Sequence, residues 1–329
     1  MSADDMHSPG LLDRLVSKVK YFDRYLIKGK NAPAEGALPS SNKELCETLS
    51  KQGYVILKSF IPQEKLDYLV KGQQERLENL EFSMPEIAQK LIDPSKDQDL
   101  IDNVFFEGKK QLIARGLTFD RGDVTSLEQA VEDFGPSTLK CFIPPKDKAY
   151  FDLWLMPEIL SLVEEYLGLR PYLLEAYTRR NYPAPFKVMN HCWHRDTNHD
   201  FHLVKVFFFL SDCELDTGPH EYVANSHRDF SLSGQRYYSS EQVDQWSSEK
   251  GHEKVLSVVP AGTVVIEDTR GLHRANIPKS KYRDLGYAVF SPVMLQNRKK
   301  MDYYQVSPEV YAKLSPMQKS YIPNLNWNS

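Results

Sequence analysis

Residues 193–210 read WHRDTNHDFHLVKVFFFL, and this stretch decides the fold that we expect. Its second half, Leu203 to Leu210, is rich in β-branched and aromatic residues and predicts a buried strand. Its first half holds His194 and Asp196, and side chains two apart on an extended chain project to the same face. Both can therefore reach one ion, and His273 offers a second imidazole further along the chain. Two imidazoles and one carboxylate suit non-haem Fe(II) and leave coordination positions open.

A lone His-x-Asp pair is a weak motif, because a surface histidine beside a turn aspartate gives the same pattern. Arg283 adds weight to the metal interpretation, since a guanidinium can grip a distal carboxylate in a bidentate fork. Arg274 is the rival for this role. It directly follows His273, so on a strand it should point away from the metal, which favours Arg283.

The second half of the chain is rich in predicted strands, and the first half in predicted helices. The expected strands are 172–177, 203–210, 255–259, 263–267 and 285–290, with turn signals at 216–219, 260–262 and Gly271. Many short strands with this spacing indicate a sandwich or barrel and not a parallel α/β sheet. Helices are expected from Ser41 to about Ser50, from Pro62 to about Leu80 and from Pro157 to Tyr166.

These patterns predict one main domain with two flanking segments. The expected parts are a basic amphipathic helix and linker over 1–41, a single domain over 42–293 and a C-terminal segment over 294–329. Within the domain we expect a variable helical lid region at 80–170 and a β core at 171–293 with an insertion at 228–254. The helix at 9–30 is interpreted as a docking helix with a solvated charged face, and peripheral membrane contact is disfavoured.

Composition excludes several classes of protein. The 329 residues carry 41% hydrophobic and 26% charged residues and a formal net charge of −4, so nucleic acid is a poor partner. The four cysteines form no CxxC pair, which favours a reducing compartment. Neither a signal peptide nor an apolar run long enough to span a bilayer is visible. We therefore expect a cytoplasmic protein.

Several motifs occur in a characteristic order. They are 49–57 (LSKQGYVIL), 60–62 (FIP), 193–196 (WHRD), 206–212 (VFFFLSD), 217–219 (TGP), 223–228 (VANSHR), 261–268 (AGTVVIED), 272–276 (LHRAN) and Arg283. This ordered set resembles the phytanoyl-CoA dioxygenase family of Fe(II)/2-oxoglutarate oxygenases. The resemblance runs from about residue 42 to 293, with a variable middle.

The resemblance implies an α+β, mainly β fold: a double-stranded β-helix (jelly-roll, cupin-like) core with N-terminal and flanking helices. It implies that His194, Asp196 and His273 bind the iron and that Arg283 holds the C5 carboxylate of 2-oxoglutarate. These are the same four side chains that the residues alone indicate.

The chain departs from the family pattern at three positions. Asn225 stands where glycine is common, and asparagine tolerates left-handed backbone well. Thr263 replaces a common aspartate, which we interpret as structural. Leu285 stands where many relatives of the wider superfamily place a serine or threonine beside the arginine, so the second partner of the distal carboxylate is open. The candidates for it are Tyr177, Thr178 and Asn190.

The function that these features predict is oxidation of a small molecule with Fe(II), 2-oxoglutarate and O2, yielding succinate and CO2. Related halogenases lack the carboxylate that Asp196 supplies, so its presence favours hydroxylation of an unactivated C–H bond, or another two-electron oxidation such as desaturation. Arg179, Arg180 and Lys187 are compatible with an anionic substrate and equally with a solvated basic edge.

Two other functions stay open. One is a non-catalytic barrel that binds a carboxylate ligand or a partner protein, with a vestigial metal site. The other is a cupin-type metal enzyme that does not use 2-oxoglutarate, and Arg283 argues against it.

Several further polar residues are expected to have no part in metal binding. A zinc site built from His191, Cys192, His194, Cys213 and His220 is disfavoured, because the cysteines are isolated. His199 and His202 are interpreted as loop residues, and Lys205 is expected to face solvent.

Overall fold

A computed structural model describes residues 40–78, 105–107, 140–143, 147–181, 191–197, 202–235, 237–292 and 306–322 of the chain. The expected helix at 9–30 and three of the residues singled out above, Lys187, Asn190 and His199, lie outside these ranges. Within them, no helix is both long enough and apolar enough to cross a bilayer.

Two antiparallel sheets form the centre of the described chain. The large sheet has the order β1-β8-β5-β10-β4-β3-β2 and the small sheet the order β7-β6-β9. The large-sheet strands are β1 (Tyr54–Leu57), β2 (Phe105–Glu107), β3 (Lys140–Ile143), β4 (Tyr172–Asn181), β5 (Val204–Phe209), β8 (Val264–Asp268) and β10 (Arg283–Ser291). The small-sheet strands are β6 (His220–Val223), β7 (Lys254–Leu256) and β9 (His273–Ala275).

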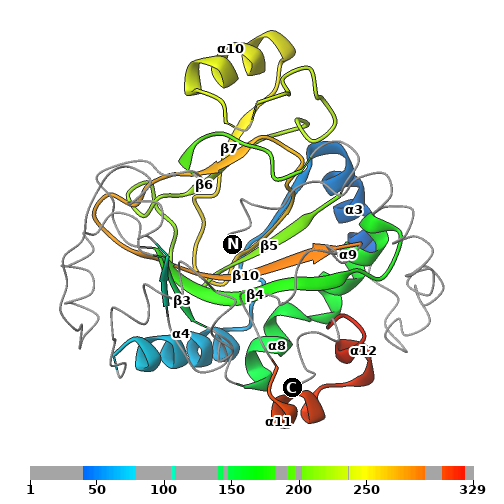
Figure 1. Ribbon diagram of the computed structural model, residues 1–329, viewed down its shortest axis with the longest axis vertical. Coiled ribbons are helices and arrows are strands. Elements are labelled where there is room, and N and C mark those ends of the chain that lie inside the picture. Colours follow the sequence, from blue (N-terminus) through cyan, green and yellow to red (C-terminus); the bar gives the residue numbers. More distant parts are fainter. Residues whose placement is uncertain are drawn as a thin grey trace.

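The chain alternates between the two sheets. After β4 it reaches the edge of the small sheet, where His194 pairs with His273, and it then returns to the large sheet as β5. It passes to β6 and β7, back to β8, across to β9 and back to β10. Figure 1 shows the small sheet lying over the large one. This winding is a double-stranded β-helix, and the predicted fold is confirmed.

Helices cover the outer face of the large sheet. They are α3 (Ser40–Gln52), α4 (Gln63–Glu78), α8 (Lys148–Trp154), α9 (Pro157–Leu167), α11 (Pro308–Lys313) and α12 (Pro316–Lys319). Side chains from this layer, among them Trp154 and Tyr321, form one apolar core with Phe208 and Phe290 of the sheet. The described end of the expected lid region, α8 and α9, belongs to this layer (Figure 1). The expected insertion at 228–254 holds α10 (Ser240–Lys250), which a capping box at Ser239 begins.

The inner face of the large sheet has a second core that faces the small sheet. Its apolar members include Tyr177, Phe207, Leu285 and Tyr287. Successive side chains of a strand point to opposite faces, and β4, β5, β8 and β10 are buried along almost their whole length, so these four strands are covered on both sides. The inner face is the one that holds the polar groups described below.

Left-handed backbone occurs at two turns beside the small sheet. Asn225 has φ 65°, as the asparagine at this turn predicts. Gly218 has φ +76°, and a Cβ added there would lie 2.5 Å from both the Asn276 oxygen and the Pro278 nitrogen. The turn before β6 therefore requires glycine.

We predict that Gly218→Ala lowers the free energy of unfolding by at least about 2 kcal/mol, because strain and a clash with backbone atoms add together. Gly168→Ala is the matched control, since Gly168 has φ +75° with nothing within 4 Å of an added Cβ. Gly168→Ala should lower the free energy of unfolding by only about 1–2 kcal/mol. Urea denaturation measures both, and equal losses would contradict the account of this turn.

Candidate metal centre

Three side chains from two distant parts of the sequence converge between the sheets. His194, Asp196 and His273 each offer one ligand atom, and these atoms lie within 4.8 Å of one another. The backbones of His194 and His273 exchange two N–H···O hydrogen bonds, both 3.0 Å. The Asp196 N–H donates to the Thr269 carbonyl at 3.0 Å. Backbone pairing thus brings both parts of the chain together before any ion binds.

The two imidazoles present the same nitrogen to the centre. His194 Nδ1 lies 2.8 Å from the Cys192 carbonyl, and His273 Nδ1 lies 2.9 Å from the Gly271 carbonyl. A carbonyl only accepts, so Nδ1 carries the proton and Nε2 keeps its lone pair. Burial, followed by the charge of His194, holds the pKa of His273 well below its usual range. His273 is therefore neutral at pH 7, which is the form that binds metal.

Asp196 supplies the anionic member of the cluster. Its carboxylate oxygens lie 3.8 Å from His194 Nε2 and 3.5 Å from His273 Nε2. Burial by itself would raise the pKa of Asp196, but the charge of Lys205, followed by those of the two histidines, holds it well below its usual range. Oδ1 is buried and has no hydrogen-bond partner among the described residues. Two imidazole Nε2 atoms and a carboxylate fit the donor set of a non-haem Fe(II) site.

Lys205 faces the interior, and the expectation that it faces solvent was wrong. It lies on β5 and shares the inner face with Phe207. Its Nζ lies 2.7 Å from Asp196 Oδ2, and its side chain is 8% exposed. An ammonium in this position offsets the charge of the Asp196 carboxylate.

A second buried pair lies next to the cluster. His220 Nε2 and Glu267 Oε2 are 2.7 Å apart, and the His220 ring lies 5.5 Å from the His273 ring. Burial, followed by the charges of Arg283 and Lys205, lowers the pKa of His220. Burial raises the pKa of Glu267, although Lys205 opposes this. Both groups therefore tend to be neutral beside the metal cluster.

Arg283 is buried at the start of β10 and faces the same interior. Its Nη1 donates to the Gly218 carbonyl, and its Nε has no hydrogen-bond partner among the described residues. Burial lowers its pKa to about 10, so it remains a cation at pH 7. Arg274, the rival, is bound elsewhere: its guanidinium contacts the Glu221 carboxylate at 2.7 Å and lies over Trp193.

The candidates for the second carboxylate partner lie in different places. Tyr177 is on the inner face, where its ring stacks on that of Tyr287 at 4.8 Å. Thr178 pairs with Gly286, and a Cβ added at Gly286 would meet Phe208 and Leu153 of the helix-side core. Cross-strand partners share a face, so Thr178 points away from the metal cluster. Asn190 lies outside the described residues.

The two arginines that the sequence offered for an anionic substrate, Arg179 and Arg180, point to opposite faces of β4. Arg180 faces outward and makes a bidentate pair with the Asp284 carboxylate, at 2.8 Å for both contacts. Arg179 faces inward and is buried.

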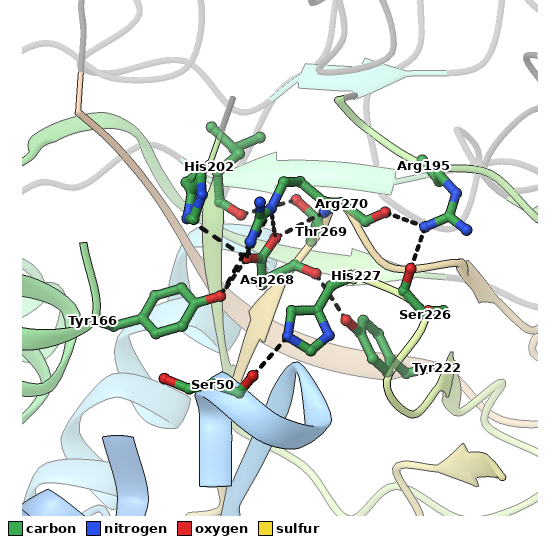
Figure 2. A network of polar contacts seen from close by, with 11 residues as sticks. Ser50, Tyr166, Arg195, His202, Tyr222, Ser226, His227, Asp268, Thr269 and Arg270 are labelled. Carbon is green, nitrogen blue, oxygen red and sulfur yellow. Dashed lines mark hydrogen bonds and ion pairs between the residues drawn. The ribbon is translucent and has the colours of Figure 1, made fainter. Parts of the chain in front are cut away.

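A polar network fixes the segments that carry the cluster (Figure 2). Arg195, between the two first ligands, points away from them and donates to the carbonyls of Ser226 and Arg270 at 2.6 and 2.5 Å. Arg270 pairs with the buried Asp268 carboxylate, which also accepts from the Tyr166 hydroxyl. The network therefore joins the His-x-Asp segment to the turn between β8 and β9.

An open groove of about 710 Å³ lies beside this network. Residues that line it include Ser50, His202, His227 and Arg270. The three cluster residues do not line it, so it is separate from the metal centre.

Sequence reasoning did not identify three of these groups: Lys205, the His220–Glu267 pair and the anchoring role of Arg195. The anchoring role of Arg195 could have been predicted from its position between His194 and Asp196. A residue between two ligands on an extended chain must point to the opposite side, where a long donor can bind neighbouring carbonyls.

We predict that Lys205→Met destabilises the metal-free protein by about 3–5 kcal/mol, because it leaves a buried carboxylate unpaired. Mn(II) should then stabilise the variant more than the parent protein, since the metal supplies the missing charge. Lys254→Met, which breaks an exposed pair with Asp244, is the control and should cost less than about 1 kcal/mol. Thermal unfolding with and without Mn(II) measures the stability of each protein and the shift that the metal causes. An equal metal-induced shift in both lysine variants would contradict it.

Comparison with known proteins gives one family and a group of solved structures. No curated protein matches the chain. Solved structures with similar folds include the epimerase SnoN from nogalamycin biosynthesis (13% identity, 77% of this chain and 84% of that one, TM-score 0.46). A second is EctD from S. alaskensis with 2-oxoglutarate and 5-hydroxyectoine (16% identity, 79% of this chain and 77% of that one, TM-score 0.47). A third is HygX from Streptomyces hygroscopicus with nickel, 2-oxoglutarate and hygromycin B (14% identity, 76% of this chain and 87% of that one, TM-score 0.44).

The family comparison covers most of the chain. The model of the phytanoyl-CoA dioxygenase (PhyH) family matches residues 49–281, which is well over half of the sequence. The match includes the His-x-Asp pair, His273 and the motifs around them. The chain therefore belongs to the phytanoyl-CoA dioxygenase family of Fe(II)/2-oxoglutarate-dependent oxygenases.

Proposed function

We propose that His194, Asp196 and His273 bind Fe(II), that Arg283 holds the C5 carboxylate of 2-oxoglutarate, and that the enzyme hydroxylates an unactivated C–H bond of a small molecule. The observation that carries this is the convergence of two Nε2 lone pairs and one carboxylate in a buried site. Iron with 2-oxoglutarate supplies the activation of O2 and the oxidation of the substrate, with release of succinate and CO2.

Each side chain has a role that follows from its surroundings. The carbonyls of Cys192 and Gly271 hold the two imidazoles in the tautomer that offers Nε2 to the metal. Asp196 supplies the carboxylate at the position that a halide takes in related halogenases, which favours hydroxylation. Arg283 is a permanent cation that no described carboxylate neutralises, so it can bind an acid.

The surroundings of the site favour a reaction shielded from water. Phe207 and Tyr287 lie between the sheets beside the polar groups and are nearly fully buried. A low-dielectric interior strengthens the contact between the guanidinium and a carboxylate. We further propose that residues 42–293 form a single oxygenase domain that carries this site.

One observation favours a second candidate, a non-catalytic barrel with a vestigial metal site. Lys205 Nζ already contacts the Asp196 carboxylate at 2.7 Å. If that ammonium stayed in place, it would repel a divalent cation. The two candidates differ in whether the protein binds Fe(II) and 2-oxoglutarate together.

We predict that anaerobic addition of Fe(II) and 2-oxoglutarate produces a visible metal-to-ligand charge-transfer band. Asp196→Ala should abolish this band, because one of the three ligands is lost. Arg283→Gln should keep it at saturation while weakening 2-oxoglutarate binding at least about 30-fold, since a buried charge pair is lost. An absorption titration measures all three proteins.

Asp244→Ala, an exposed aspartate far along the chain from the cluster, is the control and should behave as the parent protein does. Absence of the band from the parent protein would reject the proposal in favour of the non-catalytic barrel. A band of full intensity in Asp196→Ala would overturn the ligand assignment.

A further inference from the structure

Two of the buried arginines lack a carboxylate partner. Among the described residues, three buried arginines are each paired with one: Arg170 with Glu164, Arg180 with Asp284 and Arg270 with Asp268. Arg179 and Arg283 are buried as well, at 7% and 1% exposure. For both, Nε has no hydrogen-bond partner and no described carboxylate forms an ion pair. Burying a cation without a partner is costly, so two such groups together indicate a site for an anion.

The strand register places these two arginines side by side. Arg283 pairs with Asn181, and Leu285 pairs with Arg179. Arg179 and Arg283 are therefore diagonal neighbours on one face, about 7–8 Å apart at the backbone, which is within reach of long side chains. The two guanidinium groups thus border the same interior space.

Two neighbours of Arg283 on β4 carry hydrogen-bond donors on the same face. They are the amide of Asn181, directly across, and the guanidinium of Arg179, on the diagonal, and the second of these is charged. Leu285 follows Arg283 on the same face and has no polar atom in its side chain. Thr178 points to the opposite face, as its pairing with Gly286 requires. Arg179, directly across from Leu285, lies with its Cζ 5.2 Å from the centroid of the Tyr287 ring. Arg179 therefore supplies a guanidinium on the inner face of β4 at the level of Leu285, one step along the sheet from Arg283.

We propose that Arg179 is the second group that binds the distal carboxylate of 2-oxoglutarate and that, with Arg283, it makes the site selective for a dicarboxylic 2-oxo acid. This inference rests on the proposed function. A carboxylate has two oxygens and can accept from two guanidinium forks at once. The alternative occupant of Arg179 is an anionic group on the oxidised substrate, which the experiment separates.

The test compares two 2-oxo acids that differ only at the distal end. Calorimetry on the Mn(II)-loaded full chain gives the Kd of 2-oxoglutarate and of 2-oxopentanoate, which has a methyl group in place of the distal carboxylate. Arg179→Gln should weaken 2-oxoglutarate at least about 30-fold, because a buried charge pair is lost. Its affinity for 2-oxopentanoate should stay equal or rise. Arg228→Gln, at an exposed arginine, is the matched control and should change neither affinity.

Several outcomes would overturn the inference. If Arg179→Gln loses affinity for both acids equally, Arg179 has a structural role. If the Kd of 2-oxoglutarate is unchanged in this variant, Arg179 binds a different anion. If Arg179→Gln does not fold, Arg179→Lys decides, since it keeps the charge and loses the fork. Selectivity should fall in that variant, and unchanged selectivity would reject the inference.

The same titrations separate this inference from the function on which it rests. If the parent protein binds neither acid, the proposed function itself fails. If Arg283→Gln loses selectivity while both Arg179 variants keep it, only the role of Arg179 is rejected.

Discussion

The pairing of His194 with His273 is the constraint on which the rest of the site depends. Two backbone hydrogen bonds lock the edge of the small sheet in one register. A slip of one residue would turn His273 to the other face and bring Arg274 toward the metal position. In the observed register Arg274 is instead bound by Glu221. The fold thus selects which of two adjacent side chains meets Asp196.

The interior between the sheets carries more charge than a core normally tolerates. Lys205, Arg179 and Arg283 are buried there, and the Lys205 ammonium contacts the Asp196 carboxylate. On the helix side of the same sheet, by contrast, the buried arginines Arg170, Arg180 and Arg270 are each paired with an acid. Among the described residues, the buried arginines without a paired acid therefore lie on the inner face, where a ligand can use their charge.

Much of the site could be predicted from sequence because its signals are local. The two-residue spacing of His194 and Asp196 sets their common face, and Asn225 marks a left-handed turn. Lys205 and Arg179 could not be placed in this way. Their strands are buried on both faces, so no alternation of polar and apolar residues shows which side is inward. An irregularity in the β4–β10 pairing further shifts the alternation along β4.

The central claim is that three distant side chains form one iron site, and anomalous scattering at the iron edge from crystals grown anaerobically with Fe(II) tests it most directly. The account predicts one peak about 2.0–2.2 Å from His194 Nε2, His273 Nε2 and an Asp196 oxygen. A peak bound elsewhere, or no peak with Lys205 Nζ still on the Asp196 carboxylate, would contradict it.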